Sequence, residues 1–322
     1  MTARSLRSSV SVAWQAWLVR GMAVVVAALA LVPTVQAQED PPRDVPSLFS
    51  NRGSIANTRH NLTQFQPGGG GPDGTFMNTA RNDYAEICVY CHTPHGANQS
   101  TTAPLWNRTM RVTTYQTYDL LRTASLTQPV SQPGASSLTC LSCHDGQTAV
   151  DSIINMPGSG RYNGRADRDT VQNTQFLNQW VNPRGRNAVS HGRIGTECMV
   201  CHNTTGGSIG ATDFTVFVIG TDLRDDHPVG VRFPPNAGTA GSDFKDPSRK
   251  EAQIAYFDNN GNQRADPAEI RLYNTGEGYE VECASCHDPH GVPSAGPGSE
   301  FNPTFLRVAN AGSAVCLTCH TK

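Results

Sequence analysis

The sequence predicts a loop-rich fold with little sheet, in which short helices form at a repeated cysteine motif. The pattern C-x-x-C-H occurs five times in 322 residues and uses all 10 cysteines. The chain also contains 30 Gly and 21 Pro residues, spread along its length, which leave little room for long helices or strands. These observations predict a fold organised around the five motifs.

The motif C-x-x-C-H is the attachment signal for c-type haem. Its two thiols bond to the vinyl groups of one porphyrin, and its histidine binds the iron as the proximal ligand. A zinc site, a thioredoxin-like dithiol or ordinary disulfides would not need a histidine directly after each second cysteine. The sequence therefore predicts five covalently bound haem c groups and a haem-organised, loop-rich multihaem cytochrome c fold.

The five motifs, first to fifth, span residues 88–92, 140–144, 198–202, 283–287 and 316–320. The predicted thioether residues are Cys88, Cys91, Cys140, Cys143, Cys198, Cys201, Cys283, Cys286, Cys316 and Cys319. The predicted proximal iron ligands are His92, His144, His202, His287 and His320.

The chain has 10 histidines, so five remain outside the motifs to fill the five open axial positions. A six-coordinate iron can pass an electron but offers no site to a substrate. This balance favours electron transfer over catalysis, and we assign no catalytic residue. The alternative is that one iron is open or bound by Met77, Met110, Met156 or Met199. The predicted distal ligands are His60, His95, His191, His227 and His290.

The pattern C-x-x-C-H-x-P-H-G occurs twice, each time followed by a plain C-x-x-C-H, which defines an internal repeat at 88–144 and 283–320. His95 follows His92 too closely to share its iron, so we expect it at a neighbouring haem, the second. By the same reasoning we expect His290 at the fifth haem. Sequence proximity favours His60 for the first haem and His191 for the third, and leaves His227 to the fourth or the second.

Residues 1–37 are typical of a secretory signal peptide, with Arg4, Arg7 and Arg20, an apolar run at 22–32 and small residues near position 37. The run is shorter than the about 20 apolar residues that cross a bilayer, so no membrane anchor is expected. The remaining residues, 38–322, form one pentahaem domain: a haem pair at 88–144, a single haem at 198–202 and a haem pair at 283–320. We expect the protein outside the cell or at its surface, or alternatively in the periplasm.

The composition adds further limits. The formal net charge is −2 and no basic cluster occurs, so nucleic acid is not an expected partner. The hydrophobic fraction of 37% predicts a thin polypeptide core that haems would complete. Residues 115–125 have weak helical periodicity, and residues 213–220 are the strongest strand candidate.

Residues 258–269 have the ligand spacing of an EF-hand calcium loop. The sixth position is Gln263 rather than Gly, and no amphipathic helix precedes the loop, so an Asn-rich turn is the alternative. The predicted ligands of a Ca²⁺ ion are Asp258, Asn260, Asn262, Arg264, Asp266 and Glu269.

Six segments together resemble the multihaem c-type cytochromes of dissimilatory metal-respiring bacteria. They are H-N-L (60–62), C-V-Y-C-H-T-P-H-G (88–96), P-L-W-N-R (104–108), L-T-C-L-S-C-H-D-G (138–146), D-H-P-V-G (226–230) and C-A-S-C-H-D-P-H-G (283–291). Within this group the chain is most similar to the tetrahaem outer-surface cytochromes that polymerise into extracellular filaments. It departs from them by the third motif and His191.

The resemblance implies stacked bis-histidine haems with His60, His95, His227 and His290 as distal ligands. It also implies a homopolymer in which one subunit donates a histidine to a haem of the next. The expected partners are other cytochromes or redox proteins, further copies of the chain and an extracellular electron acceptor. The alternatives are a soluble periplasmic electron shuttle and, less favoured, a multihaem nitrogen-oxide reductase, which would need an open iron.

Overall fold

The computed structural model describes residues 49–62, 86–110, 113–145, 153–155, 157, 179–180, 189–190 and 218–322. All of them belong to the compact unit Asp44–Lys322. The predicted signal peptide (1–37), the third motif (198–202) and His191 lie outside the described residues. Within the described residues, no helix combines the length and the apolar character that crossing a bilayer requires.

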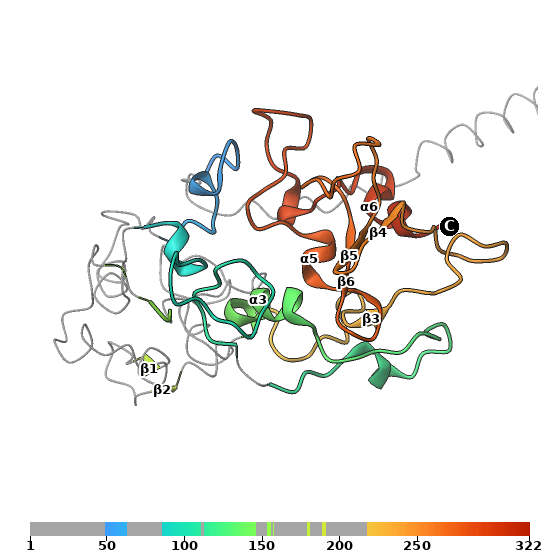
Figure 1. Cartoon of the computed structure of the whole chain (residues 1–322), viewed down its shortest axis with the longest axis horizontal. Coiled ribbons are helices and arrows are strands. Elements are labelled where there is room, and N and C mark those ends of the chain that lie inside the picture. Colours follow the sequence, from blue (N-terminus) through green and yellow to red (C-terminus); the bar gives the residue numbers. More distant parts are fainter. Residues whose placement is uncertain are drawn as a thin grey trace, which may run out of the picture. The chain divides into compact units, whose positions relative to one another are not determined.

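The largest element is a five-stranded antiparallel sheet in the C-terminal part of the chain (Figure 1). Its order is β3-β7-β6-β5-β4. The strands are β3 (Val231–Arg232), β4 (Arg249–Lys250), β5 (Ile254–Tyr256), β6 (Arg271–Asn274) and β7 (Tyr279–Val281). A separate antiparallel pair is formed by β1 (Gln179–Trp180) and β2 (Val189–Ser190).

The sequence analysis did not locate this sheet. Its strands are two to four residues long, too short to show a periodic pattern. They use aromatic and branched residues that suit a pleated surface, and β6 and β7 are joined by a turn in which Gly276 and Gly278 have φ 105° and 131°. The strand expected at 213–220 falls mostly outside the described residues, and its described part, 218–220, has no strand.

Each of the four described motifs begins on a short helix. These helices are η2 (Cys88–Tyr90), α3 (Ala135–His144), α5 (Cys283–Cys286) and α6 (Ala314–Cys319). The remaining helical elements are single 3-10 turns, and η3 (Tyr118–Leu121) is the one within the segment predicted to be weakly helical. The other turns are η1 (Ile55–Asn57), η5 (Pro303–Phe305) and η6 (Ala311–Ser313).

The described core consists of small apolar clusters, and the motif helices border them. The largest lies on the sheet, where Ala255 and Leu272 face each other across β5 and β6, and Cys286 and Cys319 pack against it. A second surrounds Tyr90 and includes Cys91 at its edge. Further members of the largest cluster are Phe233, Ala237, Phe257 and Ile270.

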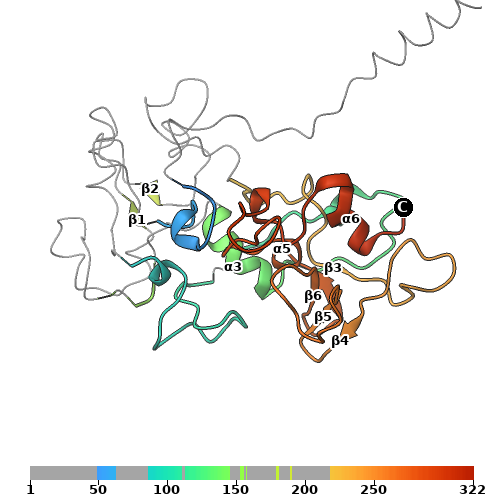
Figure 2. The same cartoon turned by 90° about the horizontal axis from the view of Figure 1, so that it is seen from above.

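Helices α3 and α5 pack directly against each other (Figure 2). The backbone N–H of Cys283 donates to Ser137 Oγ at 2.8 Å, and the backbone N–H of Gly134 donates to Glu282 Oε1 at 3.0 Å. The second and fourth motifs are therefore neighbours in space, although about 140 residues separate them in the sequence.

Candidate functional site

The two cysteines of each described motif lie within one helical turn. Residues three apart on a helix face the same side, so both sulfurs of a pair can reach one edge of a bound group. The eight cysteines of these motifs carry free thiols rather than disulfides. This is the arrangement that two thioether bonds to one porphyrin require.

Burial makes several of these thiols unlike those of a redox-active dithiol. It raises the pKa of Cys91 and of Cys319 to about 12, and the pKa of Cys283 and of Cys286 to about 11. A reactive dithiol needs a lowered thiol pKa, and a structural zinc ion needs four ligands. Among the described residues, no three His, Cys, Asp or Glu side chains are grouped so that they could hold a metal ion. The raised pKa values of Cys283 and Cys286 therefore argue against a redox-active dithiol at the fourth motif.

Two proximal histidines are oriented by backbone carbonyl groups. The Nδ1–H of His92 donates to the carbonyl oxygen of Pro104 at 2.7 Å, and the Nδ1–H of His287 donates to that of Thr304 at 2.7 Å. A ring that donates through Nδ1 has Nε2 unprotonated and available to a metal. Both imidazoles are thus held in the tautomer that an iron ligand needs.

The carbonyl groups belong to two return segments, 104–107 and 304–307, which hold the first and fourth motifs in the same way. In the first, the backbone N–H of Asn107 donates to Cys91 O at 2.8 Å and its side-chain amide donates to Val89 O at 2.7 Å. In the second, the backbone N–H of Arg307 donates to the carbonyl oxygen of Cys286 at 2.7 Å and its Nε–H donates to that of Ala284 at 3.0 Å. The two halves of the internal repeat therefore share these hydrogen bonds between motif and return segment as well as the motif sequence.

Sequence reasoning missed the role of these return segments. Pro104 lies 12 residues after His92, whereas Thr304 lies 17 residues after His287, so no fixed spacing connects the two. The shared signal is conformational: Leu105 and Phe305 both have positive φ, 55° and 60°.

The glycine that ends each P-H-G sequence is required by its surroundings. Gly96 has φ +65° and Gly291 has φ +87°, which few L residues adopt. A Cβ atom on Gly291 would lie 2.2 Å from Cδ2 of Phe301, and one on Gly96 would lie 2.9 Å from Nδ2 of Asn155. These glycines let the chain turn tightly next to each second histidine.

Two pairs of imidazole rings from distant segments lie at nearly the same spacing, one pair nearly parallel and the other perpendicular. The ring centres of His92 and His290 are 6.2 Å apart, and those of His60 and His144 are 6.3 Å apart. A bond from imidazole nitrogen to a first-row metal is about 2.0–2.1 Å, so two rings on opposite sides of one ion have centres about 6.3 Å apart. Both pairs therefore have the spacing of two axial ligands of one iron.

This pairing differs from the sequence-based assignment. The sequence favours His60 beside His92 and His290 beside His320, but the structure brings His60 to His144 and His290 to His92. These ring contacts favour other pairings, and the assignment of each ligand to an iron stays a prediction. The pairings differ because the two repeats pack on each other, so proximity along the chain does not predict proximity in space.

His60 has the properties of a neutral ligand. Its Nδ1 lies 3.1 Å from the carbonyl oxygen of Pro289, the acceptor to which it donates. Burial, followed by the neighbouring His144, lowers the pKa of His60 to about 4. The ring is therefore uncharged at neutral pH, and the hydrogen bond through Nδ1 leaves Nε2 unprotonated.

His227 is associated with the fifth motif. Burial lowers its pKa, and the nearby His320 lowers it further. His320 in turn packs against Phe244, with ring centres 4.7 Å apart. The sequence leaves His227 to the fourth or the second haem, whereas the electrostatic contact with His320 favours the fifth motif.

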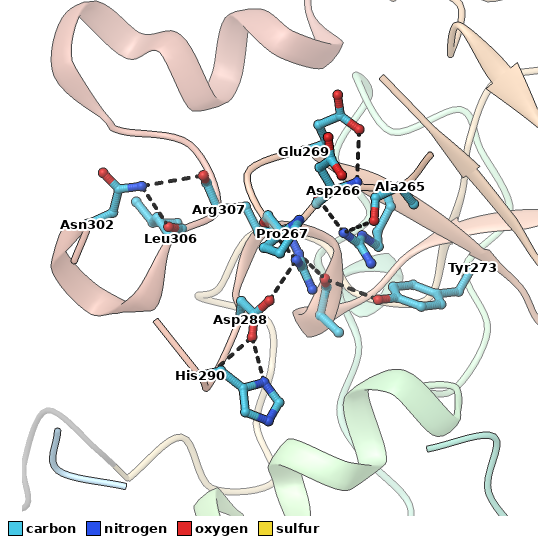
Figure 3. Close-up of polar contacts among 12 residues, drawn as sticks. Ala265, Asp266, Pro267, Glu269, Tyr273, Asp288, His290, Asn302, Leu306 and Arg307 are labelled. Carbon is cyan, nitrogen blue, oxygen red and sulfur yellow. Dashed lines mark hydrogen bonds and ion pairs between the residues drawn. The ribbon is translucent and has the colours of Figure 1, made fainter. Parts of the chain in front are cut away.

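His290 is bound to an acidic side chain (Figure 3). Its Nδ1–H donates to Asp288 Oδ1 at 2.9 Å, and Arg307 donates to Asp288 Oδ2 at 3.0 Å. Burial alone would raise the pKa of Asp288, but the hydrogen bond from His290 and the charge of Arg307 outweigh it and hold that pKa at about 2. The hydrogen bond to Asp288 also raises the pKa of His290.

A buried donor beside His92 has no partner within the described residues. Trp106 is 8% exposed, its Nε1–H is unpaired, and its ring centre lies 6.0 Å from that of His92. Buried polar groups are nearly always hydrogen-bonded. The orphaned indole therefore fits a site in which a bound group with acceptor atoms, such as haem, lies next to His92.

The described motifs form a series in space: first, second, fourth, fifth. After burial, the largest contribution to the raised pKa of Cys91 comes from Cys143, and that of Cys140 comes from Cys283. The thiol of Cys286 acts in the same way on the pKa of Cys319. Groups held at these motifs would thus be consecutive neighbours.

Two predicted ligands, His95 and His287, make no ring contact among the described residues, although His144 lies close enough to His287 to lower its pKa. The third motif, with Cys198, Cys201 and His202, lies outside the described residues together with His191, so its ligands stay a prediction.

The predicted calcium loop is closed by its own hydrogen bonds. Asp258 accepts the backbone N–H groups of Gly261 at 2.7 Å and Gln263 at 3.0 Å, and Glu269 accepts that of Asp266 at 3.1 Å. Gln263 has φ 62°, the left-handed conformation that glycine commonly supplies at the sixth position of such loops. Calcium binding here stays a prediction.

Comparison with known proteins gives one family match. The model of the family described as "Doubled CXXCH motif" matches residues 277–322, which contain the fourth and fifth motifs. A search of curated proteins finds no match.

Proposed function

We propose that the chain, whose doubled C-x-x-C-H motif indicates a multihaem c-type cytochrome, transfers electrons along five bis-histidine c-type haems. When bound, haem iron supplies a one-electron couple, and iron with imidazole on both sides has no position for a substrate. The observation that carries the proposal is the spacing of the two imidazole pairs, 6.2 and 6.3 Å. We therefore propose an electron carrier rather than an enzyme.

The protein's contribution is to hold the ligands before and after each transfer. The carbonyl groups of Pro104, Thr304 and Pro289 fix three imidazole rings in the metal-binding tautomer. Because these groups belong to backbone segments paired with the motifs themselves, the rings need not move when the charge at the iron changes. The contiguous series of motifs supports a path through the molecule.

We further propose that the protein is exported and acts as a subunit of an extracellular cytochrome filament. What supports this is that, among the described residues, no ring contact joins His95 or His287 to another imidazole, so each is left for a partner outside that set. If His95 of one copy binds the iron held by His287 of the next, the contact is head-to-tail and generates an open polymer. Alternatively, His95 pairs with His202 of the same chain, and every iron then has two histidine ligands without a second subunit. The protein would then be a soluble electron shuttle.

Intact mass and carbon monoxide binding test the electron-carrier proposal. We expect the secreted protein to carry five covalently bound haems and its reduced form to bind no carbon monoxide, because every sixth position is occupied. A stoichiometric carbon monoxide complex of the native protein would instead reveal an open iron and favour the reductase.

Electron microscopy of secreted material tests the filament proposal separately. We expect filaments from the native chain and single subunits from His95→Ala. Native material that contains five haems but stays monomeric would contradict the filament and leave the electron-carrier proposal standing.

A further inference from the structure

Asp288 connects the exposed ring of His290 to the buried guanidinium of Arg307. Its Oδ1 accepts the ring Nδ1–H of His290 at 2.9 Å and the backbone N–H of the same residue at 3.1 Å, while its Oδ2 accepts Arg307 at 3.0 Å (Figure 3). The side chains of Asp288 and Arg307 are 13% and 6% exposed. The carboxylate is thus fixed and largely shielded from water.

Arg307 cannot easily leave this position. Besides Asp288, its guanidinium donates to the carbonyl oxygen of Ala284 at 3.0 Å and to that of Pro267 at 2.8 Å. Because Arg307 occupies one carboxylate oxygen, the other oxygen remains directed at the ring of His290. The orientation of that ring is therefore determined by the return segment 304–307.

The environment of His290 differs from that of three other predicted ligands. His92, His287 and His60 each have Nδ1 directed at a neutral backbone carbonyl group. A carboxylate acceptor draws the Nδ1 proton more strongly, which makes the imidazole a better electron donor to a metal. Stronger donation and nearby negative charge stabilise the oxidised iron and lower its reduction potential.

The first repeat has no equivalent of this contact. The residue that follows His92, as Asp288 follows His287, is Thr93, and its hydroxyl donates to the backbone carbonyl of His95 at 3.0 Å rather than to a ring. The acidic contact is therefore a difference between the two repeats, not a general feature of the P-H-G sequence.

We propose that Asp288 is a positioning residue for His290 that lowers the reduction potential of the haem attached at Cys88 and Cys91. The proposal rests on the proposed function, because it requires His92 and His290 to bind one iron. With Asp288 as the acceptor of the His290 Nδ1–H, this haem has a lower reduction potential than it would have with a backbone carbonyl as the acceptor. The haems along the series then differ in reduction potential.

The test is a redox titration of the fully haem-loaded protein, followed by absorption and low-temperature EPR. His290→Met identifies the haem concerned, because methionine ligation raises its potential. We expect Asp288→Asn to raise the reduction potential of that haem. A tenfold change in the equilibrium between its oxidised and reduced forms corresponds to about 59 mV for one electron. Asp288→Glu, which keeps the charge, should stay closer to the native value.

Asp119→Asn is the matched control, since it removes one carboxylate that accepts only from Thr117 and touches no histidine. If Asp288→Asn and Asp119→Asn give the same potentials while all haems stay low-spin, the proposal is overturned. If Asp288→Asn loses the first haem, Asp288→Ser and Asp288→Glu are compared. Loss of this haem in Asp288→Ser and its retention in Asp288→Glu would support the role of the carboxylate. Loss of the haem in both variants would refute that role.

The proposed function and this inference fail differently. Native protein with an open or unattached first haem would contradict the bis-histidine pair itself. If the native protein has five low-spin haems and Asp288→Asn leaves their reduction potentials unchanged, only the inference about Asp288 is contradicted.

Discussion

Replacing Gly291 with alanine tests how the fold holds His290 opposite His92. Gly291 has φ +87°, a conformation that costs other L residues roughly 1–2 kcal/mol. The new Cβ would also lie 2.2 Å from Cδ2 of Phe301. Because Phe301 is a buried ring, relieving this overlap should cost a further 1–3 kcal/mol or so. We expect Gly291→Ala to lower the free energy of unfolding by roughly 2–5 kcal/mol.

Gly298→Ala separates the two contributions. Gly298 has φ +86°, nearly the same as Gly291, but no atom lies within 4 Å of the position that its Cβ would take. It should therefore cost only the conformational part, about 1–2 kcal/mol. Gly96→Ala should fall between the two, because the atom it meets belongs to the side chain of Asn155, which can move.

The assay is denaturant unfolding of the haem-loaded variants, followed by circular dichroism and haem absorption, together with carbon monoxide binding. We expect Gly291→Ala to displace His290 and open one iron, so that the reduced variant binds one carbon monoxide per chain. If Gly291→Ala is as stable as Gly298→Ala and binds no carbon monoxide, the tight turn does not position the histidine and the reasoning fails.

Three further predictions follow from the site. His60→Met should raise the potential of the haem at the second motif, measured by EPR-monitored titration, whereas a shift at the haem identified by His290→Met would contradict the observed pairing. Glu282 is 2% exposed and burial raises its pKa from 4.5 to about 7, so stability should fall as pH rises from about 4.5 to 7, because the folded state keeps the proton longer. The free energy of unfolding should fall by roughly 3 kcal/mol over this pH range, as measured by denaturant unfolding. The fall should disappear in Glu282→Gln but remain in the exposed control Glu300→Gln. The same dependence of stability on pH in Glu282→Gln as in the native chain would contradict this role of Glu282. Added Ca²⁺ should raise the melting temperature of the native chain but not of Glu269→Gln if residues 258–269 bind the ion, and equal melting curves with Ca²⁺ and with chelator would exclude it.

The helical turns at the described motifs could be predicted from the sequence because their chemistry is local. A C-x-x-C-H motif needs only one helical turn to place Cys283 and Cys286 on one side, and the structure has that turn. The spare histidines could be found by counting. Their partners could not, because His60 and His144 meet only after the two repeats pack together.

The supporting framework was also beyond sequence reasoning. Pro104 and Thr304 act through backbone carbonyl groups, which leave no trace in residue identity. The five-stranded sheet consists of strands of two to four residues, and burial of Ala255 and Leu272 against neighbouring segments stabilises it rather than any strong local preference. Non-local packing decides both features.

In the electron carrier that we propose, histidines from separate segments occupy both axial positions of every haem. Low-temperature EPR of the oxidised native protein, integrated against its haem content, measures this directly. We expect low-spin signals only, which integrate to five irons per chain. A high-spin signal equal to one iron or more would contradict it.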